Sequence, residues 1–390
     1  MNYRYPCSFH LISLLMAKLT VYFLLLLVVI GVFSPIIAND DPIWCSVEGN
    51  SYFPAWSEWA GSARPASLRK IDWSTSPVSD RVMPPIPFSG TQHSQDRALP
   101  PFSKTEHGWH WLGTDKEGKD VLAGLVEGTT GALKVGALAV IVAFILGGIL
   151  GGCAGYFGDE RLRLPYLLLP LVVVIVFYWY FLLFASNIGS HFSNIQKAAL
   201  TLAVLLALGM LVRLFRLGPT FGFPLDLVIM RLAEVFDTVP KLVLLLAFCQ
   251  VMERPTQTTI AIMIGFLSWP GTARLLRGEL LKLRNAPFIE AVRQLGLPRM
   301  VIFWRHALPS AIRPIALVVA LGAGQAVLLD ASLTFLNLGG STMGRANWGD
   351  QLQSARYSIG LVWVWMSPSI LLVLLSGSLY YWSNRLTLNK

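Results

Sequence analysis

The chain has 390 residues, of which 54% are apolar and 14% are charged, whereas soluble domains carry roughly 25% charged residues. So few charges cannot cover the surfaces of several globules, and four cysteines are too few for a disulfide-rich scaffold. The net charge is +9, from 31 Lys and Arg against 22 Asp and Glu, and the charged residues lie between long apolar runs. Composition therefore argues against a soluble multidomain protein and a nucleic-acid partner, and it predicts an integral protein of the lipid bilayer.

Eight apolar runs approach the length of about 20 residues that a helix needs to cross roughly 30 Å of hydrocarbon. They cover residues 19–38, 133–155, 165–186, 197–217, 232–252, 258–273, 313–334 and 360–382. The shortest run contains an interruption at Trp269-Pro270-Gly271. Because the runs are continuous, whereas the strands of a membrane barrel alternate apolar and polar residues, they predict an all-α, polytopic membrane helix bundle.

Lys and Arg in the short connections indicate the orientation of the bundle, since cytoplasmic loops carry an excess of both. The most basic connection lies between the sixth and seventh runs. It contains Arg274, Arg277, Lys282, Arg284, Arg293, Arg299, Arg305 and Arg313. With this connection in the cytoplasm, counting the crossings predicts that the N- and C-termini are both cytoplasmic.

The runs divide the chain into five segments. Residues 1–38 would hold the cytoplasmic N-terminus and the first transmembrane helix, which we favour over a cleaved signal peptide because the apolar stretch is longer than usual. Residues 39–131 would form a long external loop, a loosely folded cap without clear periodicity until about Asp120. The remaining segments would be a second transmembrane helix at 132–159, an inserted helix pair at 160–225, and a core domain at 226–390 with a cytoplasmic loop at 284–309.

The external loop contains a glycine and lysine pattern typical of phosphate-binding loops, Gly113-Thr-Asp-Lys-Glu-Gly118-Lys119. Asp120 follows at the position where that motif needs a hydroxyl group, and no strand-like run precedes it. We therefore interpret the match as chance and expect this chain to bind no nucleotide.

Three external histidines, His93, His107 and His110, could form a metal site with Cys45. Their spacing is irregular, so solvated loop histidines are the preferred interpretation and no metal is expected. Cys249 lies near an outer helix end and could meet Cys45, but we do not favour a disulfide between them.

Four ionisable residues lie at the start of the fifth run. Arg231 and Glu234 are three residues apart, and Asp237 and Lys241 are four apart, so each pair would share a helix face. Two interpretations of Arg231 and Glu234 remain open, namely a charged lining of the inner vestibule and side chains paired for solvation. Lys241 is interpreted as a snorkelling side chain, and Pro240 as the residue that opens the crossing helix.

The cytoplasmic loop at 284–309 has the pattern of two short amphipathic helices joined at Gly296, with Pro298 suited to the first turn of the second. Ile289, Val292, Leu295 and Leu297 would form an apolar ridge on an otherwise polar and basic loop. Such a ridge needs either a protein partner or the surface of an anionic bilayer to cover it.

This loop resembles the EAA loop of ABC importer permeases, with Glu290, Ala291, Gly296, Leu308 and Pro309 at that family's spacing. Further blocks across about 110–159 and 226–390 resemble dipeptide/oligopeptide (peptide/nickel) permeases. They are residues 110–122, 154–158, 268–278 and 330–339, and the triplet Asn347-Trp348-Gly349. The chain departs from the family at Val292, His306 and Asp330, in the length of the loop 39–109, and through the inserted pair.

The resemblance implies a type I permease core of six helices plus two inserted helices, working as the C-type subunit of an importer in the bacterial inner membrane. The implied partners are a homologous permease, an external solute-binding protein and two cytoplasmic ATPase subunits, which would carry the ATP and Mg. Glu290, Arg293 and the ridge would couple the ATPases to alternating access, and Asp330, Asn347, Trp348 and Gly349 would belong to an external re-entrant loop. Such a chain has no catalytic residues of its own.

Two other classes remain as alternatives. A secondary transporter or channel would be expected to carry carboxylates at mid-bilayer, and Asp330 near an outer helix end is the only late candidate. A membrane scaffold would use the external loop to bind a partner. Peptide, nickel and oligosaccharide-derived substrates remain open. The inserted runs 165–186 and 197–217 are apolar nearly all round, which favours a position away from the transport path.

Overall fold

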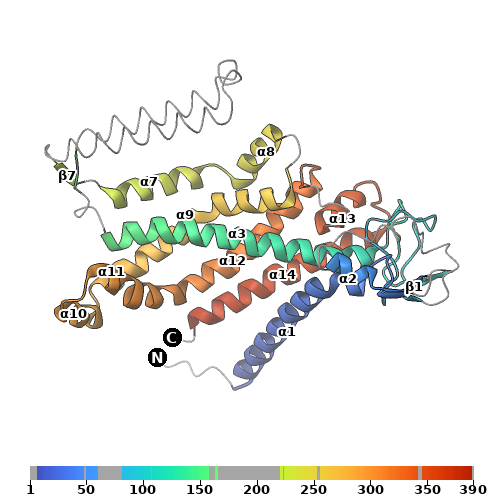
Figure 1. Ribbon diagram of the computed structural model, residues 1–390, viewed down its shortest axis with the longest axis horizontal. Coiled ribbons are helices and arrows are strands. Elements are labelled where there is room, and N and C mark those ends of the chain that lie inside the picture. Colours follow the sequence, from blue (N-terminus) through green and yellow to red (C-terminus); the bar gives the residue numbers. More distant parts are fainter. Residues whose placement is uncertain are drawn as a thin grey trace, which may run out of the picture.

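The computed structural model describes residues 7–47, 50–59, 81–106, 108–157, 163–165, 220–222, 224–252, 255–340 and 345–388. Within these residues, five helices are long and apolar enough to cross a membrane. They are α1 (Cys7–Ile37), α3 (Val121–Phe157), α9 (Gln257–Arg284), α12 (Leu308–Phe335) and α14 (Val362–Leu388), which run roughly side by side (Figure 1). The prediction of an all-α membrane helix bundle is confirmed.

Helix α3 is the central element, because α1, α9 and α12 all pack against it. Its glycines allow the close approach of α9. A Cβ added at Gly147, Gly151 or Gly155 would lie less than 3 Å from the α9 backbone, at 2.7, 2.4 and 2.9 Å respectively. These glycines are four residues apart and therefore share one face, the arrangement that lets membrane helices pack closely without a hydrophobic driving force.

The prediction of one continuous helix over the fifth run is wrong, because the helix is interrupted at Pro240. Helix α7 (Leu225–Thr238) ends before Val239, which is extended, and α8 (Lys241–Val251) begins after Pro240. Proline disfavours the helical conformation of the preceding residue and removes a backbone donor, which accounts for the break. At 11 residues, α8 is about 16 Å long and cannot cross roughly 30 Å of hydrocarbon alone.

By contrast, the expected interruption at Trp269-Pro270-Gly271 does not end α9, which continues from Gln257 to Arg284. Trp269 and Pro270 are both buried, and Trp269 packs edge-on against Phe236 of α7. Packing on both sides holds the helix through a proline that would weaken an isolated one.

The two ends of the bundle differ. The start of α1 and the end of α14 lie toward the same end of the bundle as α10 (Pro287–Gln294) and α11 (Arg299–Ile302), which a π-helical turn at Phe303–Ala307 joins to α12 (Figure 1). At the other end lie α13 (Trp348–Ala355) and the small elements of residues 38–110. Both termini of the helical core thus share an end with the basic loop, as counting the crossings predicts.

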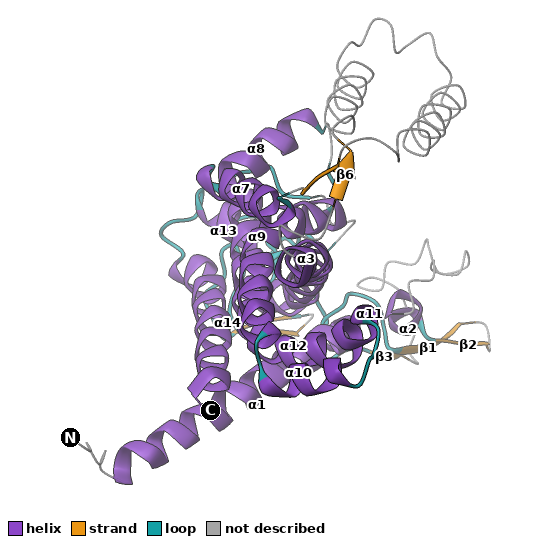
Figure 2. Ribbon diagram, turned by 90° about the vertical axis from the view of Figure 1, so that its left-hand side faces the viewer, coloured by secondary structure: helices purple, strands orange, loops and turns teal. Residues whose placement is uncertain are grey.

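The described parts of the segment 39–131 contain regular secondary structure that the sequence did not predict. They include the antiparallel sheet β2-β1-β3 (Asn50–Tyr52, Trp44–Val47, Arg81–Val82) and the short helix α2 (Pro54–Trp59) (Figure 2). They also include a hairpin of β4 (Ser103–Thr105) and β5 (Gly108–His110). In addition, α3 begins at Val121, so its first turns belong to this segment. Strands of two to four residues are too short to produce a readable alternation.

Most of the inserted pair at 160–225 lies outside the described residues. Its flanks are described, because β6 (Arg163–Pro165) and β7 (Thr220–Gly222) pair as antiparallel strands in which Pro165 is opposite Thr220. The chain therefore leaves and re-enters the described fold at one point, between the end of α3 and the start of α7.

Cys45, Cys153 and Cys249 are free thiols.

Candidate functional site

The loop between α9 and α12 is anchored to the bundle by apolar side chains. Helix α10 begins at Pro287, whose fixed φ suits the first helical position. Ile289 is 2% exposed and packs in a cluster with Leu280 of α9, Tyr156 of α3 and Phe303 of the π-helical turn. The predicted ridge is therefore wrong for Ile289, which faces the bundle, and Val292 is partly buried against the same cluster.

Gly296 joins the two short helices, as the sequence predicts. Its φ of +74° lies in the left-handed region, and its N–H donates to the Arg293 carbonyl oxygen at 3.1 Å. A Cβ added there would meet nothing within 4 Å, so the backbone conformation rather than lack of space requires glycine. The second helix follows Pro298, whose carbonyl accepts from the N–H groups of Val301 and Ile302.

The outer surface of this loop is apolar over a wider area than the ridge. We call it the loop tip patch. It comprises Phe288, Leu295, Leu297, Met300 and Trp304, which are 38–77% exposed. Met300 and Trp304 were missed because the break at Gly296 and the π-helical turn change the helical phase, so a single helical period cannot align them with the residues before Gly296. Phe288 lies before that break in α10, next to the buried Ile289, and only the packing of the loop on the bundle shows that it is exposed.

The other residues expected in this loop divide into two groups. Leu308 starts α12 and is partly buried against the anchoring cluster, whereas Pro309 is exposed in the first turn. Glu290, Ala291 and Arg293 are exposed on α10. The side chains of Glu290 and Arg293 form no hydrogen bond or ion pair with another residue that the structure describes, so they do not fix the loop internally.

Ion pairs attach α7 to α9 near the same end. Asp226 accepts a bidentate pair of hydrogen bonds from Arg277, and Asp237 pairs with Arg274. The expected pairing of Asp237 with Lys241 is wrong, because the two lie on different helices and Lys241 Nζ instead donates to Ser268 Oγ at 3.4 Å.

Arg231 and Glu234 of α7 form the expected pair at 2.7 Å. Both side chains are more than half exposed. An exposed pair of this kind contributes little to stability, so it leaves both interpretations of these residues open.

At the opposite end, Asp330, Asn347, Trp348 and Gly349 come together. The Asn347 side chain caps α13 and donates to Asp330 Oδ2 at 3.1 Å, and Asp330 is 2% exposed. Trp348 is 1% exposed, and its indole N–H donates to the Leu125 carbonyl of α3 at 2.9 Å. A Cβ at Gly349 would lie 2.8 Å from the Ala331 carbonyl oxygen. This cluster therefore joins α13 to α3 and α12.

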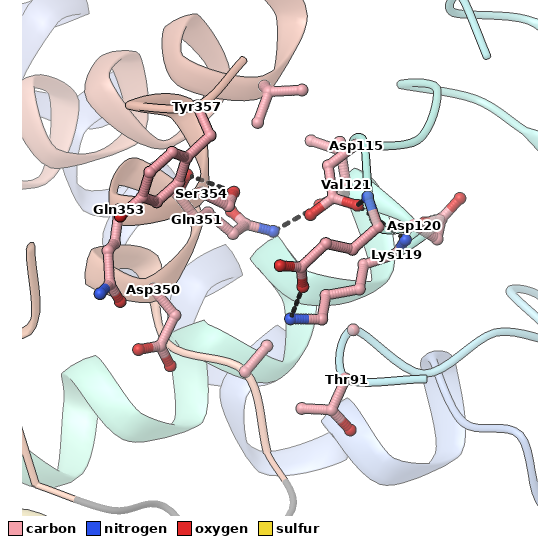
Figure 3. A pocket seen from close by; sticks show the side chains of 14 residues that line it. Thr91, Asp115, Lys119, Asp120, Val121, Asp350, Gln351, Gln353, Ser354 and Tyr357 are labelled. Atoms are coloured by element: carbon pink, nitrogen blue, oxygen red, sulfur yellow. Dashed lines mark hydrogen bonds and ion pairs between the residues drawn. The ribbon is translucent and has the colours of Figure 1, made fainter. Parts of the chain in front are cut away.

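A polar cavity of about 250 Å³ lies between α13 and the segment before α3 (Figure 3). Thr91, Glu117, Lys119, Asp350, Gln351 and Tyr357 are among its lining residues. Part of the Asp350 residue is exposed to solvent, but loss of water from around its carboxyl raises the pKa of this group to about 6. The hydrogen bond from the Asn347 N–H acts in the opposite direction and lowers this pKa. The hydrogen bond from Lys119 lowers the pKa of Glu117.

The glycine and lysine loop before α3 has a structural role. Asp115 Oδ1 accepts from the N–H groups of Glu117 and Lys119, at 2.8 and 2.9 Å. A carboxylate thus occupies the position where backbone donors of a phosphate loop would hold an anion.

His110 is not a solvated loop histidine, as the sequence suggested. It is 1% exposed, stacks on Phe88, and lies 2.7 Å from Asp120, whose other oxygen caps the start of α3. His93 is exposed, and His107 lies outside the described residues. Among the described residues, no group of three or more His, Cys, Asp or Glu is arranged to hold a metal.

Comparison with known proteins matches residues 206–388 to the family described as the binding-protein-dependent transport system inner membrane component. A protein named as a peptide permease of Brucella suis is 26% identical over 268 residues, which cover 68% of this chain and 67% of that protein. The dipeptide transport system permease of Alkalihalophilus pseudofirmus is 27% identical over 269 residues, with 68% and 67% coverage. The oligopeptide transport system permease of Haemophilus influenzae is 23% identical over 288 residues, with 74% and 71% coverage.

Proposed function

We propose that this chain is one of two permease halves of an ATP-driven importer, because residues 206–388 match the family of inner membrane components of binding-protein-dependent transport systems. It is a non-enzymatic transport subunit of the bacterial inner membrane. ATP and Mg bind to two separate cytoplasmic ATPase subunits, and an external solute-binding protein delivers the substrate.

The loop tip patch is the observation that supports this proposal most. It combines an exposed apolar surface with a buried anchor, since Ile289 and Phe303 hold the loop in the bundle while Leu295 and Trp304 face outward, 77% and 65% exposed. An apolar surface on a polar loop needs a partner, and an anchored loop moves with the helices beneath it. A cytoplasmic ATPase docked on the patch can therefore push on α9 and α12.

Peptides are the proposed substrate class. The relatives are named as peptide, dipeptide and oligopeptide permeases, and their likeness to this chain covers about two thirds of its length or more. Transport proceeds by alternating access, in which closure of the ATPases on ATP tilts the docked loops and opens the pore to one side at a time. Glu290 and Arg293, which have no partner among the described residues, would contact the ATPase surface.

The test is co-purification of the partner ATPase subunits with the Leu295→Ser, Trp304→Ser double variant. We expect normal membrane insertion and loss of the ATPase, together with loss of dipeptide uptake in whole cells. Val243→Ser, a change of an apolar residue on α8 that is also more than half exposed, is the control and should retain the ATPase. Retention of the ATPase by the double variant would contradict the proposed docking surface.

A further inference from the structure

Glu127 joins two external segments that lie far apart in the sequence. We propose that Glu127 is the positioning residue through which the segment around Ser89 and Gly90 controls Ala346 and the start of α13, and that the importer uses this junction to sense its external binding protein. The sensing role rests on the function proposed above, whereas the junction itself rests on geometry.

The carboxylate of Glu127 lies in the second turn of α3 and is 7% exposed. Its Oε1 accepts from Ser89 Oγ at 2.9 Å and from the Gly90 N–H at 2.8 Å, and its Oε2 accepts from the Ala346 N–H at 3.0 Å. The two oxygens therefore serve different segments. A buried carboxylate that accepts backbone N–H groups makes stronger hydrogen bonds than a neutral acceptor, and losing one leaves a buried donor unsatisfied.

Close packing brings the three segments into direct contact. A Cβ added at Gly90 would lie 2.4 Å from the Gly124 Cα and 2.8 Å from the Ala346 Cβ. Ile86 and Phe88 pack against α3 beside the same turn. A displacement of the segment around Gly90 therefore cannot occur without a movement at Ala346 or a separation from α3.

A continuous path leads from this junction to the cytoplasmic loop. Asn347, next to Ala346, donates to Asp330 of α12. Helix α12 runs unbroken from Phe335 back to Leu308, at the end of the loop 284–309, which we call the coupling loop. Gly90 and Ala346 also line the polar cavity, so a protein segment that enters the cavity contacts both of the segments that Glu127 joins. Helices transmit displacement as rigid elements, which gives the external segment a mechanical connection to the ATPase side.

The test uses the assembled importer with Glu127→Gln, which keeps the size of the side chain but replaces one acceptor by an NH₂ donor. The external binding protein should stimulate ATP hydrolysis at least about fivefold less than in the parent importer, while basal hydrolysis stays unchanged. Ser89→Ala, which removes one donor without altering α3, should give a smaller loss in the same direction. Glu106→Gln, at an exposed position on the β4–β5 hairpin, is the matched control and should behave as the parent.

A second measurement reads the junction without any partner. In a background whose four cysteines are replaced by alanine, a cysteine at Thr91 should react faster with an external thiol reagent when Glu127→Gln is present. Unchanged stimulation, or an equal fall of basal and stimulated hydrolysis, overturns the sensing role, and an unchanged labelling rate overturns the junction. If the parent importer shows no stimulation at all while the labelling rate changes, the proposed function fails and the junction stands.

Discussion

Single side chains in this protein have roles that their type and sequence position do not reveal. Ile289 and Leu295 both belong to the predicted ridge, yet Ile289 is 2% exposed and Leu295 is 77% exposed. The first anchors the loop and the second is available to a partner. The distinction matters for mutagenesis, because removing an anchor loosens the loop whereas removing a contact residue leaves it in place.

Ile289→Ala tests the anchor. Burial of this side chain against Leu280 and Phe303 predicts that the truncation weakens the docking of α10 by about 2–5 kcal/mol, whereas Ile289→Val should cost about 0.5–1.5 kcal/mol. Hydrogen exchange of the 287–294 amides in detergent should accelerate strongly in the alanine variant and slightly in the valine variant. Equal protection in both variants and the parent would show that α10 does not depend on this contact.

The raised pKa of Asp350 should make the free energy of unfolding depend on pH. Its pKa is raised from 3.8 to about 6 in the folded chain, so between these values the folded chain binds more protons than the unfolded chain. The free energy of unfolding should therefore fall as pH rises through this window. Asp350→Asn keeps an oxygen that can accept the Asn347 N–H and should reduce this slope.

The measurement is the midpoint of thermal unfolding in detergent from about pH 4 to about pH 7, the range in which this carboxyl titrates. Glu234→Gln, which alters an exposed carboxylate on α7, is the control and should keep the slope of the parent. An identical pH profile for the parent and Asp350→Asn would refute the assignment.

At the scale of elements, the coupling loop depends on one backbone conformation. Gly296→Val places a β-branched residue at φ +74°, where a left-handed conformation costs roughly 1–2 kcal/mol or more. We expect the variant to insert normally but to lose the ATPase, because the turn at position 296 no longer fixes the orientation of α11 and the loop tip patch relative to α10. Co-purification of the ATPase measures the effect.

Gly278→Val is the matched control for this substitution. Gly278 lies within α9 and has, like Gly296, nothing within 4 Å of an added Cβ, but it has no positive φ. The control should retain the ATPase. Normal ATPase binding by Gly296→Val would falsify the conformational requirement, and loss in both variants would point to bulk rather than backbone geometry.

At the scale of the molecule, the orientation of the bundle is a prediction from charge. A cysteine at Ser94, in the segment beside the polar cavity, should react with an impermeant reagent added outside intact cells. A cysteine at Gln294 in α10 should react only after permeabilisation, because the basic loop belongs in the cytoplasm. Labelling of position 294 in intact cells would reverse the whole topology.

The inserted segment can be removed at a defined point. Pro165 and Thr220 are opposite each other in the β6–β7 ladder, so an Asn-Gly turn can replace residues 166–219 and close a hairpin. The number of removed apolar runs is even, which preserves the sidedness of the later helices. We expect correct insertion, ATPase binding and uptake per inserted molecule close to that of the parent. Correct insertion with uptake fully lost would show that the segment takes part in transport.

Sequence alone determined that this protein is a helical membrane bundle, because runs of about 20 apolar residues have few other stable outcomes in water or lipid. It also located the turn at Gly296, since a glycine between two helical patterns is a signal of local backbone chemistry. These features depend on residues that are neighbours in the chain, and periodicity and turn residues report such neighbours directly.

Only the tertiary structure decided which side chains face one another. The burial of His110, the pairing of Asp226 with Arg277 and the junction at Glu127 all depend on segments far apart in the chain. A glutamate shortly before an apolar run has the same local pattern whether it faces solvent, a pore or two backbone N–H groups. Its role is set by what packs against it, and long-range packing leaves no periodic signal in the sequence.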